Sequence, residues 1–140
     1  MTSNPLSAYR QTRIKTASQG QLIVMLYDEG IRQLQAARNE LNSAHPKLDK
    51  AHNAIVKAQD IVTELTVSLD FDKGGDIARN LFHLYMYFNQ RLIDANMNKD
   101  ASILGEIQDL MADLREAWAS IEGTQKPVSG QAESGVNLAG

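Results

Sequence analysis

Apolar residues recur at alternating steps of three and four along most of this chain, and this repeat limits the possible folds more than any other feature. Such spacing places apolar side chains on one face of an α-helix, whereas a half-buried strand alternates at every second residue. Four stripes of this kind follow one another, and we expect each to be a buried helix face. They are Ile23, Tyr27, Gly30, Leu34, Ala37 and Leu41; Leu48, Ala51, Ile55, Ala58, Val62, Leu65 and Leu69; Ile77, Leu81, Leu84, Phe88, Leu92 and Ala95; and Ile103, Ile107, Leu110, Leu114, Ala117 and Ile121.

Short polar segments separate the stripes and predict where the helices end. Ser18 and Gln21 have the form of a capping box, which marks the start of the first helix. The segments 42–47, 70–75 and 98–102 then divide the four stripes. Links of about five or six residues make consecutive helices antiparallel neighbours. The sequence therefore predicts an all-α fold, an antiparallel up-down four-helix bundle.

The two ends of the chain differ from the middle. Residues 1–17 contain a few apolar side chains among polar ones, which predicts a short N-terminal arm too small to form a core. The bundle is expected to occupy residues 18–122. From residue 123 the sequence GTQKPVSGQAESGVNLAG is small, polar and without period, so we predict a disordered tail over 123–140.

Composition excludes several classes of function. With 140 residues the chain fits one domain, and a formal charge of −3 gives no basic surface for nucleic acid. The chain has no cysteine, which excludes disulfides, thiolate metal sites and cysteine nucleophiles. No apolar run approaches the length of a membrane span, and the first residues lack the apolar core of a signal peptide. We expect a cytoplasmic protein without stable membrane insertion.

The stretch SLDFDKGGDIARN, residues 68–80, is the first candidate for chemistry. Asp70 and Asp72 match the first and third ligand positions of a Ca²⁺-binding helix-loop-helix pattern, and Gly75 matches its glycine. Leu81, however, stands where that pattern needs a bidentate Glu. A phosphate loop would need a preceding strand and a Gly-Lys-Ser/Thr ending, and neither is present. We interpret the stretch as a corner between two helices.

The histidines give no support for a bundle enzyme. A di-iron bundle needs inward Glu-x-x-His pairs, and no Glu lies three residues before His45, His52 or His83. Nothing resembles the Gly-x-Ser-x-Gly turn of a serine nucleophile. We expect no catalytic residues, no metal and no cofactor, so a metal-dependent bundle enzyme is a disfavoured alternative.

Apolar residues outnumber those that the four stripes need. The surplus lies beside the third stripe at Phe82, Met86, Ile93 and Met97, beside the fourth at Leu104, Met111 and Trp118, and beside the first at Leu22, Met25 and Leu26. One interpretation is that each helix buries a broad arc. The other is a groove for an apolar helix or strand of a partner, for which adaptable methionines are suited. Periodicity leaves both open.

Three separated motifs, in order, resemble the FliS family of flagellin export chaperones. They are the opening Tyr9…Ile14-Lys15-Thr16-Ala17-Ser18…Leu22…Met25-Leu26-Tyr27-Asp28, the central SLDFDKGGDIARNLFHLYMYF, and RLIDANMNKDASILGEIQDLMADLREAW from Arg91. The resemblance runs from about Asn4 to Ile121. It implies a chaperone without enzymatic activity that binds the C-terminal segment of flagellin in the cytoplasm. Such a chaperone prevents premature polymerisation and helps to deliver flagellin to the type III export gate.

The predicted partner-binding surface combines part of this apolar surplus with Tyr85 and with apolar residues of the N-terminal arm. It comprises Leu6, Tyr9, Ile14, Leu22, Met25, Leu26, Phe82, Tyr85, Met86 and Ile93. The arm residues among them either cover part of the groove until the client binds or stay docked as part of the core. A bundle adaptor or regulator with a client other than flagellin is the alternative function.

Overall fold

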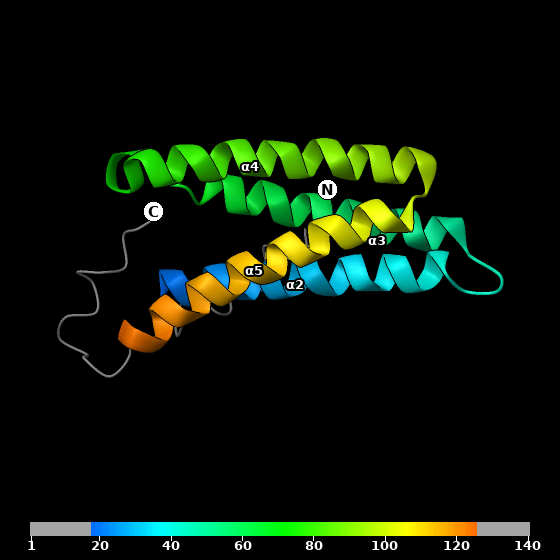
Figure 1. Cartoon of the computed structure of the whole chain (residues 1–140), viewed down its shortest axis with the longest axis horizontal. Helices are drawn as coiled ribbons and strands as arrows, with labels where there is room; N and C mark the ends of the chain where they lie inside the picture. The colour runs from blue at the N-terminus through cyan, green and yellow to red at the C-terminus, as the bar shows by residue number, and fades with distance from the viewer. Residues whose placement is uncertain (1–17, 126–140) are drawn as a thin grey trace, which may run out of the picture.

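The structure is a computed structural model that describes residues 18–125, and in that range it contains four α-helices. These are α2 (Gln19–Leu41), α3 (Leu48–Val67), α4 (Phe71–Asn98) and α5 (Ala101–Gln125). Consecutive helices run in opposite directions (Figure 1). Helix α2 packs closely against α3 and α5, and α4 completes the bundle by lying on α3 and α5. The predicted antiparallel four-helix bundle is confirmed.

The core lies between the four helices and is formed mainly by the predicted stripes. On α2, Tyr27, Leu34 and Ala37 are completely buried, and Ile23 is nearly so. On α3 the predicted stripe is buried from Ala51 to Leu65, but Leu48 at the start of the helix is 53% exposed. The core cluster is Ile23, Leu26, Tyr27, Leu34, Ala37, Ala54, Ile55, Ala58, Ile61, Val62, Leu65, Tyr85, Phe88, Leu92, Ala95, Leu104, Ile107, Met111 and Trp118.

Helix α5 buries a face that is rotated from the one that its stripe predicts, although Ile107 of that stripe is buried as expected. Leu104, Ile107, Met111 and Trp118 are buried, whereas Ala117, predicted as core, is exposed. The other predicted core residues, Ile103, Leu110, Leu114 and Ile121, are half-buried. Rotating the helix in this way replaces small Ala117 by the large apolar surface of Trp118, and more buried apolar area favours the folded state.

The first helix begins as the sequence predicts, and the last one ends later. The Ser18 hydroxyl accepts a hydrogen bond from the Gln21 backbone N–H at 3.1 Å, and the Gln21 amide oxygen accepts one from the Ser18 N–H at 3.0 Å. This is the expected capping box. Helix α5 continues to Gln125 and so includes three residues assigned to the tail. Within residues 18–125 no helix has the length and apolar character needed to span a membrane.

The corner between α3 and α4 is tighter than the predicted link over 70–75. Only residues 68–70 lie between the two helices, because 71–74 already form a helical turn. The Asp70 carboxylate caps this turn by accepting from the N–H groups of Asp72 and Lys73, both at 3.0 Å. Gly75, with φ 52° and ψ −124°, then kinks the chain before the rest of α4. Glycine suits this position because a positive φ is costly for residues with a Cβ.

Candidate functional site

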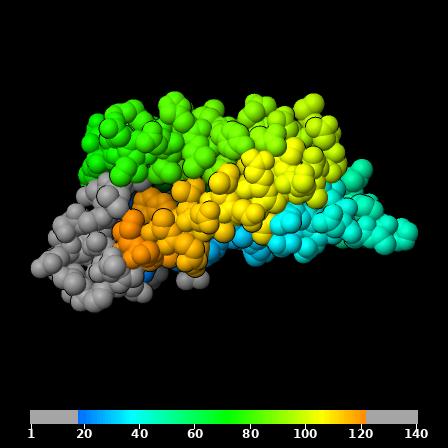
Figure 2. Space-filling model, viewed as in Figure 1, coloured from blue at the N-terminus to red at the C-terminus, as the bar shows by residue number. Residues whose placement is uncertain are grey.

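Exposed large apolar side chains gather on α4. Among the described residues, six of the eight such side chains belong to this helix, and the other two belong to α3. On α4 they are Phe71, Ile77, Met86, Tyr87, Ile93 and Met97. The third stripe predicted that Ile77 is buried, and this was wrong, because Ile77 lies near the start of the helix and is 46% exposed. Helix α4 forms one long exposed edge of the molecule in the space-filling view (Figure 2). A concentration of this kind is the usual mark of an interaction surface.

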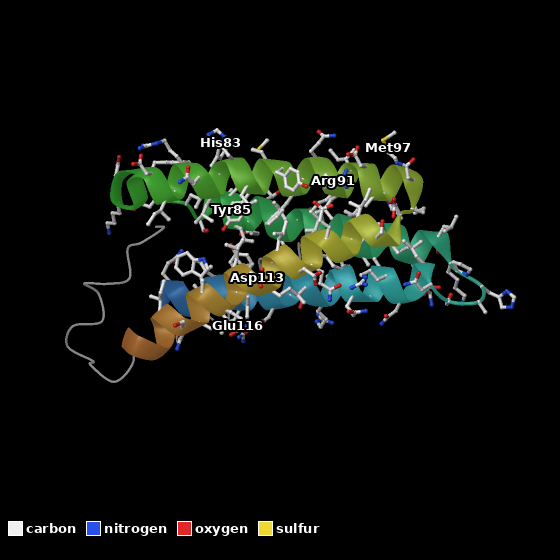
Figure 3. The ribbon with its side chains drawn as sticks, in the orientation of Figure 1. His83, Tyr85, Arg91, Met97, Asp113 and Glu116 are labelled. Carbon is white, nitrogen blue, oxygen red and sulfur yellow. The ribbon has the colours of Figure 1, made fainter. Side chains whose placement is uncertain are left out.

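Four residues of α4 form a line beside its buried face, and we call them the outer stripe: Phe82, Met86, Ile93 and Met97. Their spacing of four, seven and four residues keeps them on one helix face. Met86 is 49% exposed, Ile93 is 43% exposed and Met97 is 78% exposed. Figure 3 shows Met97 pointing outward, whereas Tyr85 lies on the side of the rest of the bundle. The line extends over about 22 Å, at 1.5 Å of rise per residue.

Phe82 at one end of the stripe is half-buried rather than open. Its ring packs edge-on against Phe71, with ring centroids 6.1 Å apart, and against His83 at 5.7 Å. The kinked first turn of α4 therefore supplies an aromatic neighbour that holds the Phe82 ring in place. The most accessible part of the stripe runs from Met86 to Met97.

The structure separates the predicted surface residues into three groups. Met86 and Ile93 are exposed, and Phe82 and Met25 are half-buried. Leu22, Leu26 and Tyr85 are buried, at 5%, 3% and 1% exposed, so their side chains contribute to packing. Leu6, Tyr9 and Ile14 lie outside the described residues. Met97, which belongs to the outer stripe, was not among the predicted binding residues although its spacing from Ile93 matched the surplus pattern.

The apolar surplus is largely buried on α2 and α5, as the interpretation of a broad buried arc predicts, whereas on α4 part of it is exposed, as the interpretation of a binding surface predicts. Leu104, Met111 and Trp118 on α5 are buried, as are Leu22 and Leu26 on α2, so these helices have broad buried arcs. On α4 the surplus remains on the surface. The candidate site is thus one face of one helix.

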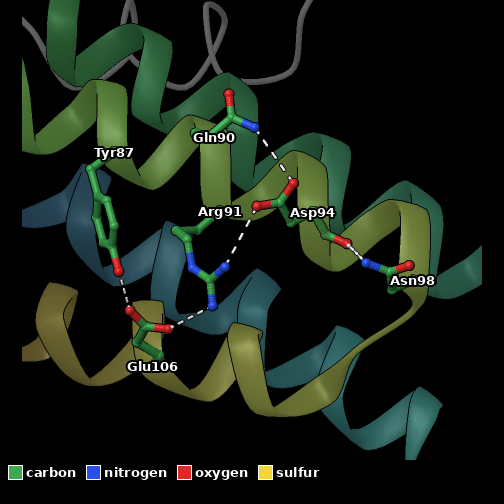
Figure 4. Close-up of polar contacts among 6 residues, drawn as sticks. All are labelled: Tyr87, Gln90, Arg91, Asp94, Asn98 and Glu106. Atoms are coloured by element: carbon green, nitrogen blue, oxygen red, sulfur yellow. Dashed lines mark hydrogen bonds and ion pairs between the residues drawn. The ribbon is translucent and has the colours of Figure 1, made fainter.

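A polar cluster along one edge of α4 fixes how the helix lies against α5 (Figure 4). Glu106 on α5 accepts hydrogen bonds from the Tyr87 hydroxyl and from Arg91 Nη2, the latter at 3.1 Å. Arg91 also pairs with Asp94 at 3.5 Å. The hydrogen bond from Tyr87, followed by that from Arg91, lowers the pKa of the Glu106 carboxyl. These partly exposed contacts join this edge of α4 to α5 and are consistent with the outer stripe lying on another face of the helix.

The other edge of α4 is tied to α3. The Asn96 side-chain amide of α4 lies 3.0 Å from His52 Nδ1 on α3. Polar contacts at both edges and apolar packing beneath leave only the outer face of α4 without a partner among the described residues.

Beneath the stripe, two tyrosine hydroxyls meet inside the core. The Tyr27 oxygen on α2 lies 2.6 Å from the Tyr85 oxygen on α4, and both side chains are buried. Burial raises the pKa of Tyr27 far above its ordinary value, and the nearby Tyr85 adds to the rise. Burial raises the pKa of Tyr85 to about 12, although its hydrogen bond with Tyr27 acts in the opposite direction. The hydroxyls therefore stay protonated and serve as a structural link rather than as an acid or base.

In the corner over residues 70–76, the carboxylates of Asp70 and Asp76 make local contacts at the start of α4. No group of three or more His, Cys, Asp or Glu side chains within the described part of the chain could hold a metal ion. Asp70 caps the helix, and Asp76 pairs with Arg79. An open hollow of about 550 Å³ lies beside the corner, lined by Gln19, Ser68, Leu69, Asp70, Phe71 and Asp72. The corner interpretation agrees with this arrangement.

Comparison with known proteins gives a consistent family. A family model described as "Flagellar protein FliS" matches residues 2–125. A "Flagellar secretion chaperone FliS" of Salmonella typhimurium strain LT2 is 36% identical over 125 residues, covering 86% of this chain and 91% of the relative. A protein of the same name in Bacillus subtilis strain 168 is 29% identical over 115 residues, covering 82% and 84%. The "Flagellar secretion chaperone FliSB" of Pseudomonas aeruginosa is 31% identical over 111 residues, covering 79% and 86%. With a family match over nearly its whole length and these relatives, the chain belongs to the FliS family of flagellar secretion chaperones.

Proposed function

We propose that this protein binds the C-terminal segment of flagellin in the cytoplasm and holds it on the outer stripe of α4. In this role it prevents flagellin from polymerising before export and helps to deliver it to a component of the flagellar type III export gate. It acts by binding and has no enzymatic activity, cofactor or nucleic-acid partner.

The observation that carries the proposal is the unpartnered apolar face of α4 in a member of a secretion-chaperone family. An amphipathic helix presents anchors at spacings of three, four and seven, and the outer stripe has matching spacings. Its length of about 22 Å corresponds to about four turns of a partner helix. Met86 and Met97 have flexible side chains that adjust to the shape of a bound apolar segment.

A client that folds as it binds would be held reversibly. Flagellin termini pair as amphipathic helices in the filament, so a free terminus exposes an apolar face. Covering that face removes apolar area from water, while ordering of the segment opposes binding. The balance gives a complex that protects the client and still releases it at export.

The test is isothermal titration calorimetry of the full-length protein with the C-terminal segment of flagellin from the same organism. We expect one-to-one binding and an increase in helical circular dichroism. Burying one large apolar side chain contributes about 1.5–3 kcal/mol. Met86→Glu or Ile93→Glu should therefore weaken binding by at least about tenfold while the melting temperature stays near that of the wild type.

The matched control is Ala36→Glu, which adds the same charge to an exposed position on α2. It should leave the affinity within about twofold of the wild type, since it alters no apolar contact of the stripe. Equal losses in all three variants would indicate a general charge effect and contradict the proposed surface. Absence of binding by the wild-type protein would contradict the proposed function itself.

A further inference from the structure

We propose that Met86 and Met97 are sites of reversible oxidation, at which a peroxide changes the outer stripe from an apolar surface to a polar one. The oxidation itself depends only on the accessibility and chemistry of this chain. Its consequence for a client rests on the proposed function.

The methionines differ widely in access to solvent. Met97 is 78% exposed, Met86 is 49% exposed, Met25 is half-buried and Met111 is completely buried. Because the chain has no cysteine, these thioethers and that of Met1 are its only sulfur atoms. The sulfur chemistry available to an oxidant on the described surface is therefore concentrated on one helix face, at Met86 and Met97.

The reaction needs no catalytic group from the protein. A lone pair on the thioether sulfur attacks one oxygen of hydrogen peroxide and the O–O bond breaks. The released hydroxide then takes the proton of the new S–OH group, which leaves the sulfoxide and water. The sulfur gains one oxygen and loses two electrons, while the peroxide is reduced by the same two electrons. Water around an exposed sulfur stabilises the separating charges, which favours Met97 and Met86 over the buried Met111.

The product alters the surface but leaves the core intact. A sulfoxide replaces a flexible apolar group by a polar, chiral one, which weakens apolar contacts. Two of the four residues of the outer stripe change in this way. Met111 lies inside the bundle, where a Cβ on Gly30 would meet its methyl group at 2.6 Å. Because there is no free space at that position, an oxidant reaches Met111 only when the bundle opens.

A first experiment tests the sites without any client. The full-length protein is treated with hydrogen peroxide, the peroxide is removed with catalase, and peptide mass mapping follows each methionine over time. We expect Met97 to react first, Met86 next, and Met111 at least about tenfold more slowly than Met97. Retention on a hydrophobic-interaction column should fall in step with the first two, while the melting temperature stays unchanged.

The matched control is the Met86→Leu/Met97→Leu variant, which keeps the stripe apolar but removes both oxidisable sulfurs. Its column retention should not change on peroxide treatment, even though Met1 and Met25 remain. Comparable oxidation rates at Met111 and Met97, or a retention shift of equal size in the leucine variant, would overturn the inference.

A second experiment measures the consequence for binding. The chaperone is oxidised before it is mixed with the untreated C-terminal segment of flagellin. We expect affinity to fall about tenfold and to return after treatment with methionine sulfoxide reductases and dithiothreitol, a dithiol that supplies the two electrons. In the leucine variant, whatever its own affinity, peroxide should change binding by less than about twofold.

The two proposals fail in different ways. If oxidation and column retention follow the expected pattern but untreated protein never binds the flagellin segment, the proposed function is wrong and the oxidation sites stand. If untreated protein binds and the oxidised protein binds equally well, the proposed function stands and the switch is refuted.

Discussion

At the scale of single residues, the contact between Tyr27 and Tyr85 places two polar hydroxyls in the core, where each needs a hydrogen-bond partner. It joins α2 to α4 through two hydroxyls 2.6 Å apart in an otherwise apolar interior. A buried polar atom that loses its partner keeps the cost of leaving water, and this cost often exceeds the net value of the bond. The pair therefore favours the one arrangement of helices in which both hydroxyls meet.

Removing one of the two hydroxyls tests this role. Tyr85→Phe leaves the Tyr27 hydroxyl without its main partner and should lower the free energy of unfolding by about 1–3 kcal/mol. Replacing both tyrosines by phenylalanine should cost less than the sum of the single changes, because no orphaned hydroxyl remains. Urea denaturation measures both effects. Tyr87→Phe serves as the control: it removes an exposed hydrogen bond to Glu106, which water can replace, and should therefore change stability far less.

The raised pKa values of the pair also predict the response to alkaline pH. An unfolded tyrosine ionises at about pH 10, whereas Tyr27 and Tyr85 in the fold hold their protons to higher pH. The unfolded state therefore loses protons first as the pH rises. The raised pKa values of the two tyrosines therefore contribute fully to the free energy of unfolding below about pH 10, and this contribution declines above it. We expect the free energy of unfolding, measured in urea, to fall between about pH 8 and about pH 11. The fall should be smaller in the Tyr27→Phe/Tyr85→Phe variant than in the wild type.

At the scale of helices, the close approach of α2 to α3 and α5 depends on Gly30. A Cβ at this position would lie 2.6 Å from the Met111 methyl group and 3.1 Å from Ile61 Cγ2. Both neighbours are buried, so neither has solvent to move into. Glycine at this position leaves room for the neighbouring helices, although glycine favours a helix less than alanine does.

Exchanging glycine for alanine at two sites separates these effects. Gly30→Ala should lower the free energy of unfolding by about 1–2 kcal/mol, since overpacking outweighs the gain in propensity. Gly105→Ala should leave it unchanged or raise it by up to about 1 kcal/mol. The atoms nearest to its Cβ would be those of the Arg38 guanidinium, at 3.2 Å, and that flexible end can shift. Thermal and urea unfolding measure both variants, and an equal loss at the two positions would refute the packing explanation.

The helices also show where sequence periodicity is sufficient and where it is not. On α2 only one apolar stripe has a complete set of spacings, so its buried face was predicted correctly. On α5 two overlapping stripes have the same period, one with Ala117 and the other with Trp118. Period alone does not choose between them, because the choice depends on the volume that neighbouring helices leave. The corner at 70–75 was misjudged because a capped turn of helix before Gly75 has the composition of a loop.

At the scale of the whole molecule, the fold was predictable and the site only in part. Four stripes and short links determine an antiparallel bundle with little ambiguity. Met86 and Ile93 were correctly placed outside the main stripe, but Tyr85 lies in the core. Whether a surplus apolar residue is buried depends on which helices pack most closely, and α4 has its outer side uncovered among the described residues. Which residues are covered is decided by the packing of all four helices, so the sequence of one helix does not predict it.

The expectation that the protein binds no metal can be tested on the full-length chain. A ligand that binds only the folded state raises the melting temperature. We expect the full-length protein to melt at the same temperature in Ca²⁺ and in EDTA, because the Asp70 carboxylate is occupied as a helix cap. A Ca²⁺-dependent rise that disappears in Asp72→Ala would reverse this conclusion.

The orientation of the outer stripe also affects how such a protein can change over generations. Met86, Ile93 and Met97 lie on the exposed side of α4, while its buried residues face the other helices. Under the proposed function, substitutions at these three positions should therefore change which segment the protein binds and leave the buried core unchanged. Substitutions that adapt the protein to a changed partner therefore need not lower its stability. For the laboratory, a library randomised at these three codons should be folded in nearly every member and differ mainly in its targets.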